Sequence, residues 1–319
     1  PEWLDWQREH LCDPLYRMDL DLTPASLTLA QARLDLPEGF RLPLPSEPYV
    51  PAISRDSAGL IVLGTAFWTM TAEARRRELS QWLVMKADGR VAVWVDPATR
   101  PKGLPNDIES GVRVFAAGAD VGEGVSASET TCIVLTGDTR EQAAEFGSNR
   151  ITPGDFGVLM AAICRYFNDA LAVPVRKMHG ITVIRAMLEE GGYGRIWHSR
   201  RSDTPIETRA DALGWAKGEM DDLLFGRWVT AVQEHRVTLH SATLWQEHSQ
   251  YIYDEHGRIC HQALANVAVE ERKRHGDRTV GVALAYRGML DLPLWRDEKP
   301  KDNAPMGSLN YRRELRGQT

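Results

Sequence analysis

The hydrophobic positions in the second half of the chain alternate between spacings typical of strands and of helices. From Val112 onward the pattern predicts three consecutive strands, then helix, strand, helix, strand and helix, with a last apolar helix near the C-terminus. The strands are expected at 112–118, 131–135, 142–145, 171–175 and 195–198, and the helices at 153–170, 180–190, 207–234 and 276–287. This order favours an α/β fold with a mixed sheet flanked by helices.

The first half of the chain has a less regular pattern, which prolines and glycines interrupt. A helix is expected at 1–18, a proline-rich extended linker up to about residue 56, a strand at 60–67 and a short helix at 71–82. Asp88 and Gly89 separate two apolar runs, which predicts a hairpin at 83–96. The expected divisions are an N-terminal linker or connector at 1–55, a small α+β subdomain or insertion at 56–107, the main domain at 108–295 and a flexible C-terminal tail at 296–319.

Composition narrows the class of protein without identifying a function. The 319 residues include 38 Lys+Arg and 44 Asp+Glu, a net charge of −6, and 43% are hydrophobic, which is typical of a soluble globular protein. We expect no membrane helix, since no apolar run approaches about 20 residues, and no secretory signal, since the first ten residues are polar and acidic. The four cysteines form no CxxC pair, which favours buried thiols over a zinc or redox site. The mild acidity argues against a uniformly basic DNA coat, but it leaves a nuclease with an acidic site open.

Several motifs of nucleotide-binding proteins and hydrolases are absent from the sequence. No G-x-x-x-x-G-K-[ST] occurs, so a P-loop ATPase within this chain is not expected. H-E-x-x-H and G-x-S-x-G are also absent, which disfavours a zinc protease or a serine hydrolase.

Two acidic residues stand at the ends of predicted elements. Asp120 follows the first strand of the main domain and precedes two glycines, where a carboxylate can bind a hard cation or cap a turn. Asp277 opens the last helix between Arg274 and Arg278, where it can be a helix cap or a metal ligand with phosphate-binding arginines beside it. Together the two acids suggest a paired-metal site for phosphodiester chemistry.

Other polar residues could belong to the same site or simply be solvated. Glu129, at the start of the second strand, is either a further metal ligand or an edge charge. His179 lies between a strand and a helix, where a lone histidine is more often a loop residue than a functional one.

The succession of segments in the main domain resembles the nuclease domain of tailed-phage terminase large subunits. The resemblance covers about residues 112–290 and rests on short segments in the family's order and spacing. They are AGADVGEG with ETTCIVLTGDTREQAAEF, ITPGDFGVLMAAICRYFNDA, RKMHGITVIRAML, DALGWAKGEMDDLLFGRW, LHSATLWQEHSQYIYDEHGRI and RHGDRTVGVALAYRGM. The opening QREHLCDPLYR is similar to the segment that joins ATPase and nuclease domains in that family.

The resemblance implies an RNase H-like fold for 108–295 and a nuclease that cuts concatemeric phage DNA during packaging. It implies two Mg²⁺ or Mn²⁺ ions held by acids, with Asp120 and Asp277 as catalytic metal ligands and Glu129 as a further one. Double-stranded DNA, a terminase ATPase domain, the small terminase subunit and the portal protein are the implied partners, in the cytoplasm of a host that carries the phage or prophage.

The sequence departs from the family pattern at one expected metal ligand. The family's acid on the fourth strand falls at Val175, and its asparagine falls at Lys177. The second ion should therefore bind weakly unless Glu129 or His179 compensates. Arg176, Lys177, His275 and Arg278 are expected at the lip of the site or on DNA phosphates.

Three functions remain open on this reading. The first is a two-metal endodeoxyribonuclease without its motor, and the second is a weak or inactive nuclease-like module that binds DNA or the portal. The third is another RNase H-like enzyme, such as a junction resolvase, which would prefer branched DNA.

Overall fold

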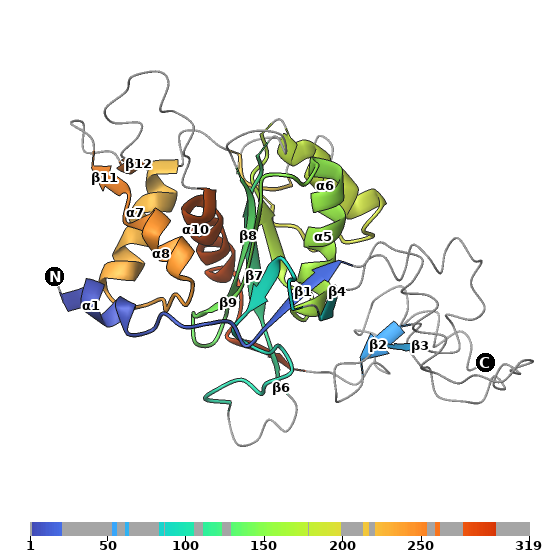
Figure 1. Cartoon of the computed structure of the whole chain (residues 1–319), viewed down its shortest axis with the longest axis horizontal. Coiled ribbons are helices and arrows are strands. Elements are labelled where there is room, and N and C mark those ends of the chain that lie inside the picture. The colour runs from blue at the N-terminus through green and yellow to red at the C-terminus, as the bar shows by residue number, and fades with distance from the viewer. Residues whose placement is uncertain are drawn as a thin grey trace, which may run out of the picture.

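The computed structural model shows a central sheet between two layers of helices (Figure 1). It describes residues 2–20, 53–55, 61–63, 83–85, 87–104, 111–122, 129–177, 179–198, 213–216, 221–253, 259–261 and 277–297. None of the helices in these ranges is long and apolar enough to cross a membrane.

The main sheet has seven strands, and the chain before residue 108 contributes three of them. Their order across the sheet is β10 (Leu171–Pro174), β7 (Phe115–Asp120), β8 (Thr130–Thr136), β9 (Gln142–Ser148), β5 (Val91–Val93), β1 (Tyr16–Leu20) and β4 (Leu83–Met85). Only the β10–β7 pair is parallel, and every other pair is antiparallel. The mixed sheet between helices confirms the predicted α/β class with a mixed sheet flanked by helices.

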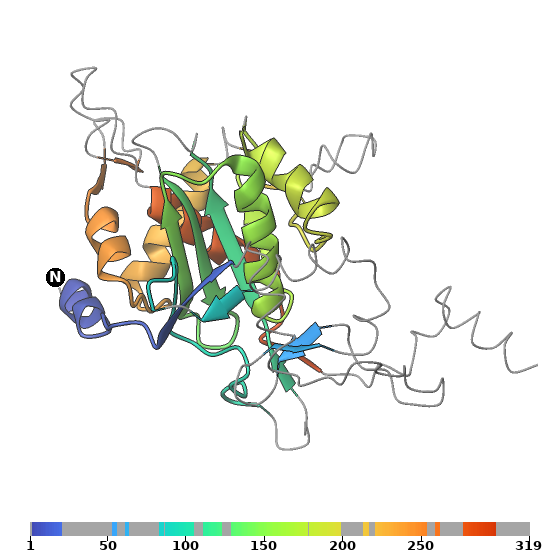
Figure 2. The ribbon, with the colours of Figure 1, turned by 45° about the vertical axis from the view of Figure 1, so that its right-hand side comes forward.

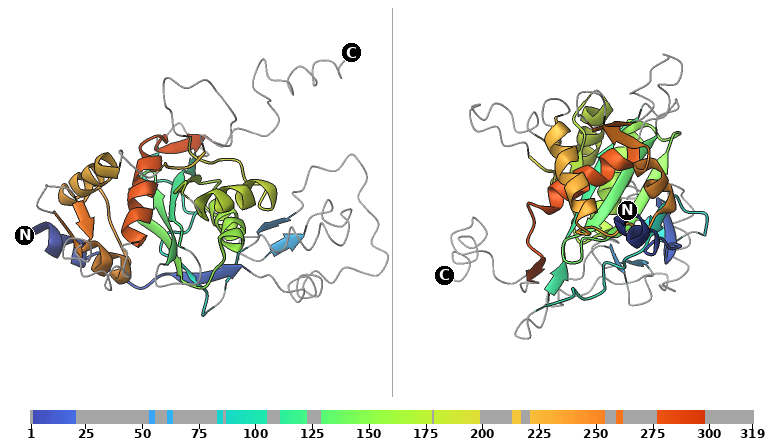
Figure 3. Two further views of the ribbon diagram at one scale, coloured as in Figure 1. Left: turned by 90° about the horizontal axis from the view of Figure 1, so that it is seen from above. Right: turned by 90° about the vertical axis from the view of Figure 1, so that its left-hand side faces the viewer.

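Helices cover both faces of the sheet. On one face lie α5 (Pro153–Tyr166) and α6 (His179–Glu189), with α5 in front of the strands in Figure 2. On the other face α10 (Asp277–Met289) lies against the sheet, and α7 (Asp221–Gln233) and α8 (Ala242–His248) cover it from outside (Figure 3). The N-terminal helix α1 (Glu2–Arg8) lies beside α7 and α8.

The small remaining strands form separate pairs. β6 (Gly111–Arg113) pairs with β13 (Trp295–Asp297), β11 (Tyr251–Tyr253) with β12 (Ile259–His261), and β2 (Ile53–Arg55) with β3 (Ile61–Leu63).

Alternation along β7 assigns its side chains to two separate cores. Phe115, Ala117 and Ala119 belong to the core under α5 and α6. Ala116 belongs to the core that includes α10, α7 and α8. Because side chains of a strand alternate between faces, Asp120 lies on the α10 side.

Two glycines let α10 approach the sheet closely. A Cβ at Gly118 of β7 would overlap the carbonyl oxygen of Gly281 and the backbone nitrogen of Ala285. A Cβ at Gly281 would in turn lie 3.3 Å from the Thr131 hydroxyl. The first turns of α10 are therefore fixed against the C-terminal end of β7.

Three predicted elements differ in the structure: the hairpin at 83–96, the helix at 1–18 and the helix at 207–234. The expected hairpin at 83–96 does not form, because β1 lies between β4 and β5 and pairs with both. Gly89 packs on the backbone of Met18, where a Cβ would lie 2.5 Å from the carbonyl oxygen. The helix expected at 1–18 is only Glu2–Arg8, after which the chain becomes β1.

The long helix expected at 207–234 is shorter in the structure. Residues 213–216 are not helical: Leu213 bridges to His198 and Trp215 to Val175, with a bend at Gly214 between them, and α7 begins at Asp221. The helix expected at 71–82 and the tail beyond Asp297 lie outside the described residues.

Candidate active site

Asp120 ends β7, and Val175 directly follows the parallel strand β10 at the same edge of the sheet. The Asp120 carboxylate is half-buried, and its Oδ1 accepts the Val121 N–H at 3.0 Å. The N–H of Val175 donates to the carbonyl oxygen of Ala119 at 2.9 Å, which continues the β10–β7 register. Val175 therefore lies beside Asp120, and it is 4% exposed. The position where the resemblance expects an acid is occupied by a buried isopropyl group.

Asp277 lies at the same end of the sheet, at the start of α10. It is 5% exposed, and its Oδ2 accepts the Glu129 N–H at 2.7 Å. The Thr131 hydroxyl donates to the Asp277 carbonyl oxygen at 2.9 Å. Thr131 is also the cross-strand partner of Asp120. Thr131 thus links the backbone positions of the two acids that the sequence singled out, which lie at the same end of the sheet.

Arg278 is the centre of a second group of acids. Its guanidinium pairs with Glu129, with Glu145 of β9 at 2.8 Å and with Glu247 of α8 at 3.5 Å. Burial alone would lower the pKa of Arg278, but Glu145 and Glu129 outweigh it and raise that pKa. We call Arg278 with Glu129, Glu145 and Glu247 the arginine cluster. The structure therefore places Arg278, expected on DNA phosphate, among carboxylates.

Glu247 caps the start of α10. Its Oε1 accepts the Thr279 N–H at 2.9 Å, which satisfies a donor that the first helical turn leaves open. Burial raises the pKa of Glu247 to about 7, although the Thr279 and Arg278 hydrogen bonds and the Arg278 charge oppose that rise. The cap and the arginine cluster together fix the turn that carries Asp277.

The remaining residues expected at the site are less closely connected to the acids. Arg176 is half-buried, Lys177 is exposed, and both follow β10 on the turn into α6. His179 begins α6 and is partly exposed. These three residues lie within four positions after Val175 in the chain, at the edge where β10 ends. His275 lies outside the described residues.

The side chains at this edge offer the oxygen ligands that hard divalent cations prefer. The Asp120 and Asp277 carboxylates provide that chemistry, whereas the Glu129 carboxylate is ion-paired with Arg278. Within the described ranges, no group of three or more His, Cys, Asp or Glu side chains is arranged to hold a metal ion. The donor set therefore fits a site built on two aspartates more readily than one built on three acids.

Sequence reasoning missed Glu145 and Glu247. Glu145 ends a predicted strand and carries no turn or motif signal. Glu247 lies on α8, a helix that begins at the N-cap Ser241, whose hydroxyl accepts the Leu244 N–H at 3.1 Å. Ser241 was the available signal for this helix, because serine is a preferred N-cap residue.

Comparison with known proteins gives similarity at the level of structure alone. No family model matches the chain, and no curated protein matches it. The structure is similar to the large terminase nuclease from thermophilic phage G20c, with 18% identity, a TM-score of 0.41 and coverage of 63% of this chain and 90% of that one. Its magnesium-bound form gives 18% identity, a TM-score of 0.43 and coverage of 63% and 89%. The Thermus phage P74-26 large terminase nuclease domain gives 18% identity, a TM-score of 0.40 and coverage of 63% and 86%. All three are structures of phage large terminase nucleases.

Proposed function

We propose that this chain is the nuclease part of a phage DNA-packaging terminase and cuts concatemeric double-stranded DNA with a divalent metal. The proposal is carried by Thr131, which is the cross-strand partner of Asp120 and donates its hydroxyl to the carbonyl oxygen of Asp277 at the same end of the sheet. The order of sequence segments around the two acids adds support. The proposed setting is the cytoplasm of the phage's host, with the terminase ATPase domain, small subunit and portal as partners.

In this proposal Asp120 and Asp277 hold Mg²⁺ or Mn²⁺. When bound, the metal supplies charge stabilisation at the scissile phosphate and an activated water. Asp277 is oriented by the Glu129 N–H, and the capped first turn of α10 prevents it from turning away. Arg176, Lys177 and His179 lie where they can contact DNA phosphates next to the site. A second ion binds weakly, because Val175 provides no ligand and Glu129 is held by Arg278.

The replacement at Val175 and the ion pair between Arg278 and Glu129 favour a second candidate function. Val175 lies next to Asp120 at the position where the family pattern has an acid, and Arg278 neutralises the carboxylate of Glu129. A module with these changes binds DNA or the portal while cutting slowly or not at all.

The test is cleavage of supercoiled plasmid with Mg²⁺, Mn²⁺ or EDTA. Asp120→Asn and Asp277→Asn keep the shape and a hydrogen-bond acceptor while removing the charge. Asp155→Asn is the matched control, because Asp155 is also a first-turn helix aspartate but is exposed on α5. We expect the parent and Asp155→Asn to cut the plasmid only when metal is present. Asp120→Asn and Asp277→Asn should cut no more with metal than the parent does in EDTA.

Two outcomes would separate the candidate functions. Equal cutting by Asp277→Asn and the parent would reject the proposed metal site. If the parent binds DNA in a salt-dependent way but does not cut with any metal, the binding module is the better account. Val175→Asp then provides a further test, since an acid beside Asp120 should create or increase metal-dependent cutting.

A further inference from the structure

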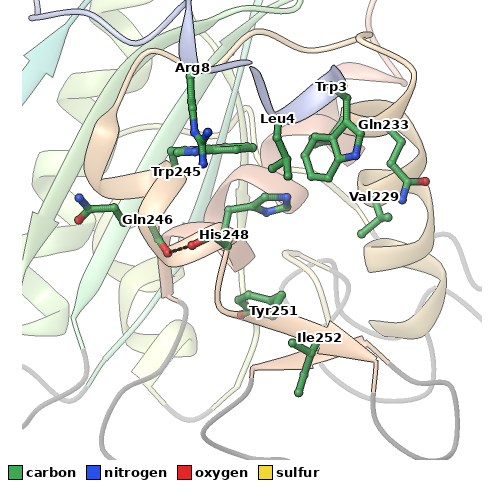
Figure 4. Close-up of a pocket in the computed structure, with 12 residues that line it drawn as sticks. Trp3, Leu4, Arg8, Val229, Gln233, Trp245, Gln246, His248, Tyr251 and Ile252 are labelled. Atoms are coloured by element: carbon green, nitrogen blue, oxygen red, sulfur yellow. Dashed lines mark hydrogen bonds between the residues drawn. The ribbon is translucent and has the colours of Figure 1, made fainter. Parts of the chain in front are cut away.

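A pocket of about 610 Å³ lies on the outer helical layer, lined by residues of α1, α7, α8 and β11 (Figure 4). Its volume is in the range typical of small-molecule sites. None of the acids of the candidate active site lines it. The proposed nuclease function does not use this space.

The walls of the pocket are mainly aromatic and aliphatic. Trp3 of α1 meets Trp245 of α8 edge to face, with ring centroids 5.9 Å apart and planes at 82°. Tyr251, Leu4 and Val229 complete the apolar lining that the close-up shows. Flat aromatic walls favour a flat aromatic ligand, since stacked and edge-on ring contacts add to the effect of area burial.

His248 brings one directed polar group to these walls. It is 8% exposed, and its ring points into the pocket below Leu4 and Trp3 (Figure 4). Its Nδ1 accepts the indole N–H of Trp228 at 3.3 Å, so in the neutral ring Nε2 carries the proton. Among the described residues, Nε2 has no hydrogen-bond partner. Burial lowers the pKa of His248 to about 4, so the ring is neutral near pH 7.

Arg8 provides positive charge at the rim. Its guanidinium lies beside Trp245 in the close-up, and it is paired with Asp5 of the same helix at 3.3 Å. Both side chains of that pair are exposed, at 64% and 74%, so the pair contributes little and is easily exchanged for an anion. An apolar aromatic cavity with an inner N–H donor and a cationic rim matches a nucleobase that carries a phosphate.

We propose that this pocket binds a nucleotide, with its base against the aromatic wall of Trp3, Trp245 and Tyr251, a base acceptor on His248 Nε2–H and its phosphate at Arg8. The same chemistry is offered by a free nucleotide and by an unpaired nucleotide at the end of a DNA strand. The inference does not depend on the cleavage activity.

The test is titration of the full chain with AMP, adenosine and a short single-stranded oligo-dA, followed by tryptophan fluorescence and calorimetry. His248→Asn keeps an acceptor for Trp228 but loses the inner donor, whereas His248→Gln keeps a distal donor. His198→Asn, at an exposed histidine away from the pocket, is the matched control. We expect quenching by AMP, binding about threefold to tenfold weaker in His248→Asn than in His248→Gln, and no change in the control.

The phosphate contact and the source of the nucleotide have separate readouts. Arg8→Gln should weaken AMP but leave adenosine unchanged. Competition between AMP and oligo-dA assigns the pocket to a DNA end, and binding of AMP alone assigns it to a free nucleotide. The proposal is overturned if neither ligand binds at about 1 mM. It is also overturned if N-acetyltryptophanamide binds as tightly as AMP, or if His248→Asn binds as the parent does.

Discussion

Glu247 and His248 are neighbours on α8, and burial shifts their pKa values in opposite directions. The pKa of Glu247 rises from 4.5 to about 7, and that of His248 falls from 6.5 to about 4. Each shift is about 2.5 units (7 − 4.5 and 6.5 − 4), which corresponds to about 3 kcal/mol in the free energy of unfolding. The charged groups that face Glu247 are Arg278 and, through it, Glu129 and Glu145. His248 faces the indole rings of Trp228 and Trp245.

The two shifts have opposite consequences for stability. The folded state holds the Glu247 proton more tightly than the unfolded state, so this group's stabilisation is complete below pH 4.5 and is lost as the pH rises through about 7. The folded state holds a His248 proton less tightly, so stability from this group rises between about pH 4 and pH 6.5. The two contributions therefore nearly cancel in the parent, and single substitutions should reveal each of them.

The assay is urea unfolding of the parent, Glu247→Gln, His248→Asn and the double variant between about pH 4 and pH 7.5. Relative to the parent, Glu247→Gln should gain about 3 kcal/mol of stability as the pH rises, because only the His248 contribution remains. His248→Asn should lose about 3 kcal/mol over nearly the same interval. The double variant should follow the parent. Profiles of the single variants that run parallel to the parent's would refute the reasoning.

Three further predictions concern the packing and charges of α10. Gly118→Ala should lower the free energy of unfolding by about 3 kcal/mol or more, because its Cβ would overlap the α10 backbone; Gly154→Ala, with open space around it, is the control in the same urea titration. Arg278→Met should cost about 3 kcal/mol in the free energy of unfolding measured by the same urea titration, because it leaves the arginine cluster's carboxylates without their cation. Thr279→Val should raise the melting temperature, because the buried Thr279 hydroxyl has no partner among the described residues and removing it relieves about 1 kcal/mol.

The middle of the fold was predictable because its elements carry strong local patterns. β7, β8 and β10 are buried on both faces and are therefore nearly continuous apolar runs. α5 begins with Thr152 as N-cap and Pro153 at its first turn, which are standard start signals. Asp120 and Asp277 were found because each marks the end of such an element.

The outer half of the sheet was not predictable from local signals. Asp88 and Gly89 are a typical hairpin turn, and a hairpin between their flanking strands is the simplest reading. The structure instead inserts β1 between those strands, from about 70 residues earlier in the chain. A pairing at this separation leaves no local signal in the sequence. The close approach of Gly89 to the Met18 backbone is visible only in the folded structure.

The arginine cluster could not be predicted for a related reason. Its three carboxylates come from the start of β8, from β9 and from α8, and converge on one side chain of α10. Each of these residues is unremarkable in its own segment. Only tertiary packing brings the three carboxylates to Arg278. The sequence around Arg278 shows none of them, so it led to the prediction that Arg278 contacts DNA phosphate.

The position of β1 also determines which shortened forms of the protein can remain monomeric. A fragment that begins near residue 108 keeps β9 but loses β5, β1 and β4, which continue the sheet beyond it. The outer edge of β9 would then present unpaired N–H and C=O groups next to the buried ring of Phe146. Such bare edges are templates for intermolecular strand pairing. A fragment that begins before Tyr16 and retains β4 and β5 keeps that edge covered.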